Sequence, residues 1–296
     1  MSYSSFENIK DEERKKKMGK ANWNIGFMAW RIGDILELYD QIEWIHNAGF
    51  DAIGIHSSPG IPNNWQGVDP SVTNGDERRR LRQKLETFRM CEIHAPFDLV
   101  LRADILESVR RDSQRTNTEK LSEHIILAGD IGASVLTVHA DISAYLPEAM
   151  KEWEEQLSRL DAQVRKAGIV VGLEITKGFE FIREFRGDNI GITLDIGHIY
   201  LNDGEGYLPY RTVSALINIL DNKLLHIHIH DYNGVNDHIE IGTGHVNFGE
   251  LFHALIMLDF KGALCLELNP DLVSPDGIIR SLEYLRTLIG MNIADK

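Results

Sequence analysis

The 296-residue sequence contains only two cysteines and lacks any long run of apolar residues. Cys91 and Cys265 lie inside apolar segments and form no CxxC pair, which is typical of a reduced, cytoplasmic protein. No apolar stretch approaches the roughly 20 residues that a membrane-spanning helix needs, so we expect no membrane association. Residues 1–20 are highly charged and have no apolar centre, which predicts a solvated helix or tail and argues against a secretory signal.

Positive charge is also scarce. The chain has 31 lysine and arginine residues against 45 aspartate and glutamate residues, a formal net charge of −14. Binding to a nucleic-acid backbone needs an excess of positive charge, so this balance argues against nucleic acid and favours a small molecule as partner. The hydrophobic content of 43% is enough for a sizeable core. The sequence leaves open whether the chain forms homo-oligomers.

Short apolar segments alternate eight times with longer segments of helical periodicity. The predicted strands span residues 22–29, 51–57, 91–96, 135–140, 169–175, 190–196, 224–230 and 263–269. The amphipathic segments between them include residues 35–47, 76–89, 116–129, 147–167, 209–221 and 248–258. This order is typical of an α/β protein with a (β/α)₈ barrel. No linker or repeat divides the chain, so we expect a single TIM-barrel domain over residues 21–296.

Two features favour a closed barrel over an open, doubly wound sheet. In the segment 169–175, aliphatic residues alternate with Gly172 and Glu174. In a barrel the aliphatic face meets the helices, and the face with small and polar groups lines the interior. An open sheet usually carries a glycine-rich turn after its first strand, and the turn at residues 28–33 has no such pattern.

Six of the predicted strands end in a histidine or a carboxylate. These residues are His94, His139, Glu174, Asp195, His228 and Glu267. Because the C-terminal ends of barrel strands converge on one mouth, we expect Glu174, Asp195, His228 and Glu267 to meet there. Three carboxylates and an imidazole suit a divalent metal such as Mn²⁺, Co²⁺, Mg²⁺ or Zn²⁺. The sequence therefore predicts a metal site at the mouth.

The run from Leu224 to Asp231 alternates histidine with aliphatic residues, which places three histidines on one face of a strand. His226 lies two positions, or roughly 6.6 Å, deeper than His228, so we expect a core histidine with a hydrogen-bond partner. His230 and Asp231 are predicted to orient the metal ligands.

Seven short motifs follow one another from the third predicted strand to the eighth. They are His-Ala-Pro at 94–96, Val-His-Ala at 138–140, Gly-Leu-Glu at 172–174, Leu-Asp-Ile-Gly-His at 194–198, His-Ile-His-Asp at 228–231, Asp-His-Ile-Glu-Ile-Gly-Thr-Gly at 237–244 and Leu-Glu at 266–267. In this order the motifs resemble the xylose isomerase-like barrel superfamily. That superfamily contains sugar isomerases and epimerases as well as the metal-dependent abasic-site endonuclease IV.

The resemblance to the epimerase branch implies a divalent-metal-dependent sugar, or sugar phosphate, isomerase or epimerase. It implies that Glu174, Asp195, His228 and Glu267 hold one ion, that a sugar carbonyl and its adjacent hydroxyl chelate this ion, and that His198 contacts the substrate. Glu174 and Glu267 would then be the catalytic groups that exchange a proton beside the carbonyl. A hydride shift between adjacent carbons is the rival mechanism.

The resemblance to the endonuclease branch implies instead three zinc ions and the cleavage of abasic DNA. The further positions that would bind metal or substrate are His94, His139, His198 and His238. One ligand departs from the pattern, because Asn236 stands where that branch has an aspartate and Asp237 is displaced by one position. A third hypothesis is a barrel that binds a metal or carbohydrate and runs another reaction, such as dehydration.

Four further residues are candidates for substrate contacts. His56 ends the second predicted strand, and Trp30 and Trp65 follow the first and second strands. The two tryptophans could stack on a sugar ring or simply cap the barrel. Lys177, three residues after Glu174, could contact a phosphate.

Overall fold

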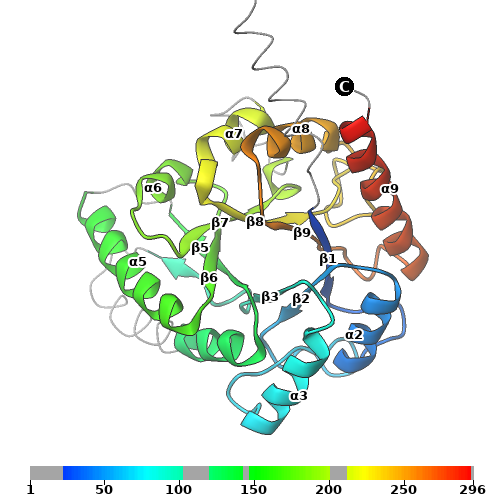
Figure 1. The fold of residues 1–296 in the computed structure, drawn as a ribbon, viewed down its shortest axis with the longest axis horizontal. Helices are drawn as coiled ribbons and strands as arrows, with labels where there is room; N and C mark the ends of the chain where they lie inside the picture. The colour runs from blue at the N-terminus through cyan, green and yellow to red at the C-terminus, as the bar shows by residue number, and fades with distance from the viewer. Residues whose placement is uncertain (1–22, 103–119, 143–146, 201–211, 295–296) are drawn as a thin grey trace, which may run out of the picture.

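The computed structural model describes residues 23–102, 120–142, 147–200 and 212–294, and its centre is a ring of eight parallel strands (Figure 1). These are β1 (Asn24–Ala29), β2 (Ala52–His56), β3 (Met90–His94), β5 (Val135–Asp141), β6 (Val170–Glu174), β7 (Ile190–Asp195), β8 (Leu224–Ile229) and β9 (Ala263–Leu266). The ring closes because β1 pairs with β9 and β3 pairs with β5. The two-residue β4 (Leu101–Arg102) lies beside β5, outside the ring. The predicted closed barrel is confirmed.

Helices surround the ring on its outside (Figure 1). They are α2 (Leu38–Asn47), α3 (Gly75–Leu85), α5 (Pro147–Ala167), α6 (Phe179–Glu184), α7 (Val213–Leu220), α8 (Phe248–Leu258) and α9 (Pro275–Ala294), together with a helix over residues 120–131. The helix predicted at 248–258 has these bounds, whereas the one predicted at 35–47 begins at Leu38. The predicted tail at 1–20 lies outside the described residues.

Side chains near the helix starts set several of these bounds. Asn74 accepts hydrogen bonds from the backbone N–H groups of Asp76 and Glu77, and the Glu77 carboxylate accepts from the backbone N–H of Asn74. Thr212 caps α7 in the simpler way, by accepting from one backbone N–H. Each cap satisfies otherwise unpaired N–H groups and contributes about 1 kcal/mol.

The barrel interior is lined by small and polar groups, as the alternation in the sequence predicts. Thr137 Oγ1 of β5 lies 2.9 Å from Thr193 Oγ1 of β7, over the intervening strand β6. A Cβ atom at Gly172 would collide with Thr193 Oγ1, so only glycine leaves room for this pair. On the opposite face of β6, Val171 and Leu173 are fully buried against the helices.

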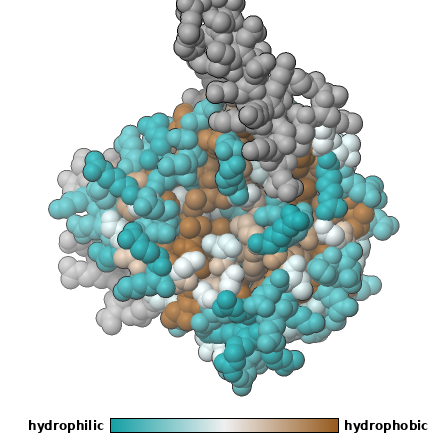
Figure 2. Space-filling view, viewed as in Figure 1, coloured by the Kyte–Doolittle hydropathy of each residue, from teal (hydrophilic) through white to brown (hydrophobic). Residues whose placement is uncertain are grey.

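The outer surface is polar at its edge. In the view of Figure 2, hydrophilic side chains cover the periphery, and hydrophobic ones gather toward the middle. This is the distribution expected when helices turn their apolar faces toward the strands. Among the described residues, no helix combines the length and the apolar character that crossing a membrane requires.

Candidate metal centre

The strand ends bring the four predicted ligands together around one imidazole. Glu174, Asp195 and His228, at the ends of β6, β7 and β8, offer ligand atoms that all lie within 4.8 Å of one another. Glu267 follows β9 directly, and its Oε2 lies 3.0 Å from His228 Nδ1. Glu174 Oε2 lies 3.5 Å from the same nitrogen. The two glutamates that the resemblance makes catalytic therefore lie beside the same nitrogen of His228.

Two atoms of this group indicate that it fits a divalent ion. Asp195 Oδ2 and His228 Nδ1 are buried and make no hydrogen bond of normal geometry, and their nearest ion-pair partners are His198 Nδ1 at 3.3 Å and Glu267 Oε2 at 3.0 Å. A buried polar atom without a partner costs about 1–3 kcal/mol, so native proteins keep few of them. A cation between these atoms would satisfy both. Oxygen-rich ligands with one imidazole suit Mn²⁺, Co²⁺, Mg²⁺ and Zn²⁺.

The charges of the group support the same interpretation. Burial opposes the ionisation of Glu267, but the charge and hydrogen bond of His228 lower its pKa to about 2. Burial also opposes a charge on His228, yet the neighbouring Glu92 and Glu267 raise its pKa well above the usual value. When no cation is bound, these shifts favour ionised carboxylates and a protonated imidazole. A bound cation would take the place of that proton.

A second set of ligand atoms shares Glu174. The Nε2 atoms of His94 and His139 lie 3.3 and 3.4 Å from Glu174 Oε2. His94 is buried and His139 is partly exposed at the mouth, with 27% of its side chain accessible. The geometry therefore brings both predicted residues to the site and is compatible with either a second metal or a substrate contact.

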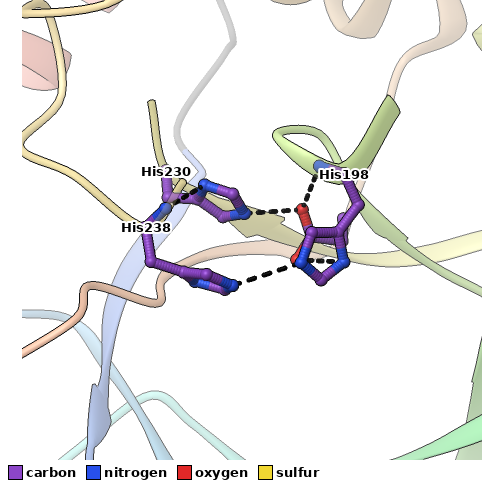
Figure 3. A group of neighbouring side chains, drawn as sticks. His198, His230 and His238 are labelled. Atoms are coloured by element: carbon purple, nitrogen blue, oxygen red, sulfur yellow. Dashed lines mark hydrogen bonds and ion pairs between the residues drawn. The ribbon is translucent and has the colours of Figure 1, made fainter. Parts of the chain in front are cut away.

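A third set shares Asp195 and contains His198, His230 and His238 (Figure 3). His198 Nδ1 lies 3.3 Å from Asp195 Oδ2, and His198 Nε2 lies 3.2 Å from His238 Nε2. Burial opposes a charge on His198, but the adjacent Asp195 and Glu174 raise its pKa to about 10. The ring of His230 stacks on that of His238, with centroids 3.8 Å apart.

His230 and Asp231 act at different places. His230 Nε2 lies 2.8 Å from Asp195 Oδ1, the contact expected of a residue that orients a metal ligand. Asp231 instead accepts hydrogen bonds from the backbone N–H groups of Gly242, Gly244 and Val246. The carboxylate of Asp231 therefore holds the loop that carries His238, and it orients the ligands through this loop and not by direct contact.

Asn236 stands where the endonuclease branch has an aspartate, but the same loop brings the carboxylate of Asp237 toward the ligands. The backbone N–H of Asn236 donates to Asn233 Oδ1 within a turn. Asp237 Oδ2 lies 3.8 Å from His198 Nε2. The displaced carboxylate thus still approaches the third set of ligands.

Of the four candidates for substrate contacts, His56 packs with Trp30 and Trp65, whereas Lys177 lies apart on an exposed loop. His56 is buried, and its ring centroid lies 5.1 Å from that of Trp65 and 6.0 Å from that of Trp30. Burial lowers the pKa of His56 to about 3, and its Nε2 makes no hydrogen bond. Trp65 is buried by this packing, and Lys177 is exposed on the loop after β6.

Sequence reasoning missed one buried acid, Glu92, which faces the barrel interior from β3. Its carboxylate oxygens lie 2.7 Å from His226 Nε2 and 2.7 Å from His228 Nε2. The expected partner of the core histidine His226 is therefore Glu92. The signal was present in the alternation Glu92-Ile-His94, because residues two apart in a strand share a face.

His124 is connected to the backbone of His94 by hydrogen bonds through Ser57. Ser57 Oγ donates to the carbonyl oxygen of His94 at 3.0 Å, and His124 Nδ1 lies 2.8 Å from Ser57 Oγ. Burial lowers the pKa of His124 from 6.5 to about 4, although Asp69 opposes the shift. As the pH falls below 6.5, the unfolded chain takes up this proton first, so stability is lost down to pH 4.

We therefore expect the free energy of unfolding of His124→Gln to fall less than that of the wild-type protein when the pH is lowered. Between pH 7 and pH 4.5 the wild-type protein should lose about 2–3 kcal/mol more than the variant in urea unfolding. Parallel profiles for the two proteins would contradict the assignment. His46→Gln is the matched control, because His46 is exposed on the surface helix α2.

Comparison with known proteins agrees with this architecture. A family model described as "Xylose isomerase-like TIM barrel" matches residues 42–288. An uncharacterized protein of Methanocaldococcus jannaschii is 28% identical over 227 residues, 69% of this chain and 72% of that protein. A solved D-tagatose 3-epimerase-like protein is 21% identical, with a TM-score of 0.68 over 91% of this chain and 98% of that chain.

A second solved structure, D-psicose 3-epimerase from Clostridium cellulolyticum H10 with D-tagatose, is 12% identical to this chain. Its TM-score is 0.68, over 90% of this chain and 99% of that chain. At such identities the solved structures show a common fold, whereas the family model matches the sequence itself over most of its length. The chain therefore belongs to the xylose isomerase-like TIM barrel family.

Proposed function

We propose that this protein is a divalent-metal-dependent sugar isomerase or epimerase that moves a proton at the carbon beside a carbonyl. The observation that carries the proposal is the pair of buried carboxylates beside one imidazole nitrogen. Glu174 Oε2 and Glu267 Oε2 lie 3.5 and 3.0 Å from His228 Nδ1. The similar folds of proteins named D-tagatose 3-epimerase-like and D-psicose 3-epimerase support a carbohydrate substrate.

The residues that would hold the ion are Glu174, Asp195, His228 and Glu267. When bound there, the ion supplies stabilisation of the negative charge that develops on the substrate oxygens. Two strands, β7 and β8, separate β6 from β9 in the ring, so Glu174 and Glu267 approach a substrate at the mouth from different sides. One carboxylate takes the proton and the other returns one.

The product depends on which carbon atoms the two carboxylates reach. Two acid–base groups on opposite faces of one carbon invert its configuration, which is epimerisation. One group that serves two adjacent carbons interconverts an aldose and a ketose. His198, with 28% of its side chain accessible and a pKa of about 10 in the ion-free site, is placed to donate a hydrogen bond to a substrate oxygen.

The test is a panel of ketoses, aldoses and their phosphates incubated in D₂O with protein loaded with Mn²⁺, Co²⁺, Mg²⁺ or Zn²⁺. We expect one small sugar to be interconverted, with solvent deuterium at the reacting carbon. Mass spectrometry gives the deuterium content, and chromatography identifies the product. No interconversion of any member of the panel with any metal would overturn the proposal.

A phosphodiesterase acting on abasic DNA is the second candidate. The observation that favours it is the presence of three neighbouring ligand sets, which share Glu174 and Asp195. The net charge of −14 argues against it, because affinity for a phosphate backbone comes largely from lysine and arginine. Incision of an abasic duplex by the metal-loaded protein, with no sugar converted, would favour this candidate.

A further inference from the structure

The barrel interior holds a buried carboxylate directly beneath the proposed ion site. Glu92 is 1% exposed, and three donors converge on it. His226 Nε2 lies 2.7 Å from Oε2, His228 Nε2 lies 2.7 Å from Oε1, and Thr137 Oγ1 donates to Oε1 at 2.5 Å. A charge in such a place is costly, so the cluster needs an explanation beyond packing.

We propose that Glu92 is a positioning residue that fixes the tautomer and the orientation of His228 for metal binding. This inference rests on the proposed function, because it assumes that His228 is a ligand. An ionised carboxylate only accepts hydrogen bonds, so His228 must carry its proton on Nε2. In the neutral ring the lone pair is then on Nδ1, the nitrogen that faces Glu174 and Glu267.

The geometry explains why a carboxylate stands there and not a neutral acceptor. The two oxygens of Glu92 serve two imidazoles that point toward it from neighbouring positions of β8. A glutamine has a single carbonyl oxygen, so its amide nitrogen would face one of the two rings and require a lone pair on that Nε2. If that ring is His228, its proton moves to Nδ1 and blocks the metal. If it is His226, the proton moves to Nδ1, which is buried and has no partner.

An ion bound by Glu92 itself is the alternative explanation of this cluster. Glu92, His226 and His228 form another compact set of possible metal ligands. The short N···O distances of 2.7 Å instead join the carboxylate directly to both rings through hydrogen bonds. The two interpretations differ in what happens at Nε2 of His226. A metal would remove the proton from that nitrogen, whereas the positioning role keeps it there.

The test compares Glu92→Gln and Glu92→Leu with the matched control Thr137→Val. The control removes another donor from the same buried carboxylate and leaves the acceptor of His228 in place. We expect both Glu92 variants to bind Zn²⁺ and Mn²⁺ about 10- to 100-fold more weakly in chelator competition. Thr137→Val should stay within about three-fold of the wild-type protein, because its hydroxyl does not contact His228.

Nitrogen NMR of the Zn²⁺-loaded wild-type protein shows which imidazole nitrogens carry a proton and which bind the metal. A purely structural role of Glu92 does not require any particular one of these arrangements. The expected spectrum has a proton on Nε2 of both histidines and the metal on Nδ1 of His228.

Metal on Nε2 of either ring, or an equal loss of affinity in Thr137→Val, would overturn the role of Glu92. Unchanged affinity in both Glu92 variants would do the same while leaving the proposed function intact. A wild-type protein that binds no divalent metal would overturn both proposals. The spectrum decides the question alone if neither variant folds.

Discussion

We expect the Asp195→Ala protein to lose its divalent ion and its sugar-converting activity together. Asp195 Oδ2 is buried without a hydrogen-bond partner, and Oδ1 accepts from the backbone N–H of His198 and lies 2.8 Å from His230 Nε2. The substitution therefore removes a ligand and also releases the backbone of His198 and the side chain of His230. Metal affinity should fall more than about 100-fold, and kcat/KM by about three orders of magnitude or more.

The matched control for this variant is Asp161→Ala. Asp161 is also buried, and it accepts hydrogen bonds from Asn189 and Arg165 away from the mouth. Its loss should lower stability and leave the metal content unchanged. Metal content is measured by elemental analysis of the purified proteins, and turnover is measured with the sugar identified by the panel. Full metal content in Asp195→Ala would show that Asp195 is not a ligand.

The second large effect is expected from Glu174→Gln and Glu267→Gln, which should stop proton exchange with solvent. An amide has nearly the shape of a carboxylate and can still offer an oxygen to a divalent ion, but it cannot take up a proton at neutral pH. We expect deuterium incorporation to fall by about 10²- to 10⁴-fold, the usual contribution of a general acid or base. Metal affinity should fall much less than in Asp195→Ala.

Glu77→Gln is the control for these two variants, because Glu77 accepts the backbone N–H of Asn74 at the start of α3 and belongs to none of the ligand sets. It should convert the sugar at the wild-type rate. Two results would count against the assigned roles. Retained exchange in both variants would exclude Glu174 and Glu267 as the proton carriers. Interconversion by the wild-type protein without solvent deuterium would instead favour the hydride shift.

Much of the candidate site could be predicted because a barrel relates local pattern to position. A residue at the end of a parallel strand reaches the mouth whatever its place in the chain. For this reason Glu174, Asp195 and His228 could be assigned to one cluster before any distance was known. Glu267 could be assigned in the same way, although the strand predicted at 263–269 ends at Leu266 and the glutamate follows it.

Contacts between distant segments could not be predicted in the same way. Glu92 is 134 residues from His226 and 136 residues from His228, and nothing local indicates that these side chains meet. Their approach depends on how the strands are staggered when the ring closes. The position of Asp237 beside His198 likewise depends on the path of a loop that Asp231 holds from within.

The sequence by itself determined the barrel, the order of its strands and the identity of the residues at its mouth. These features follow from two-residue alternation, helix-length spacing and short motifs, which are all local properties of the chain. Only the tertiary structure decided which atoms meet: two glutamates beside one nitrogen of His228, Glu92 beside the other, and His56 packed among aromatic rings. The physical reason is that hydrogen bonds and metal coordination require distances near 3 Å, and side-chain alternation specifies a face of a strand but not a distance across the barrel.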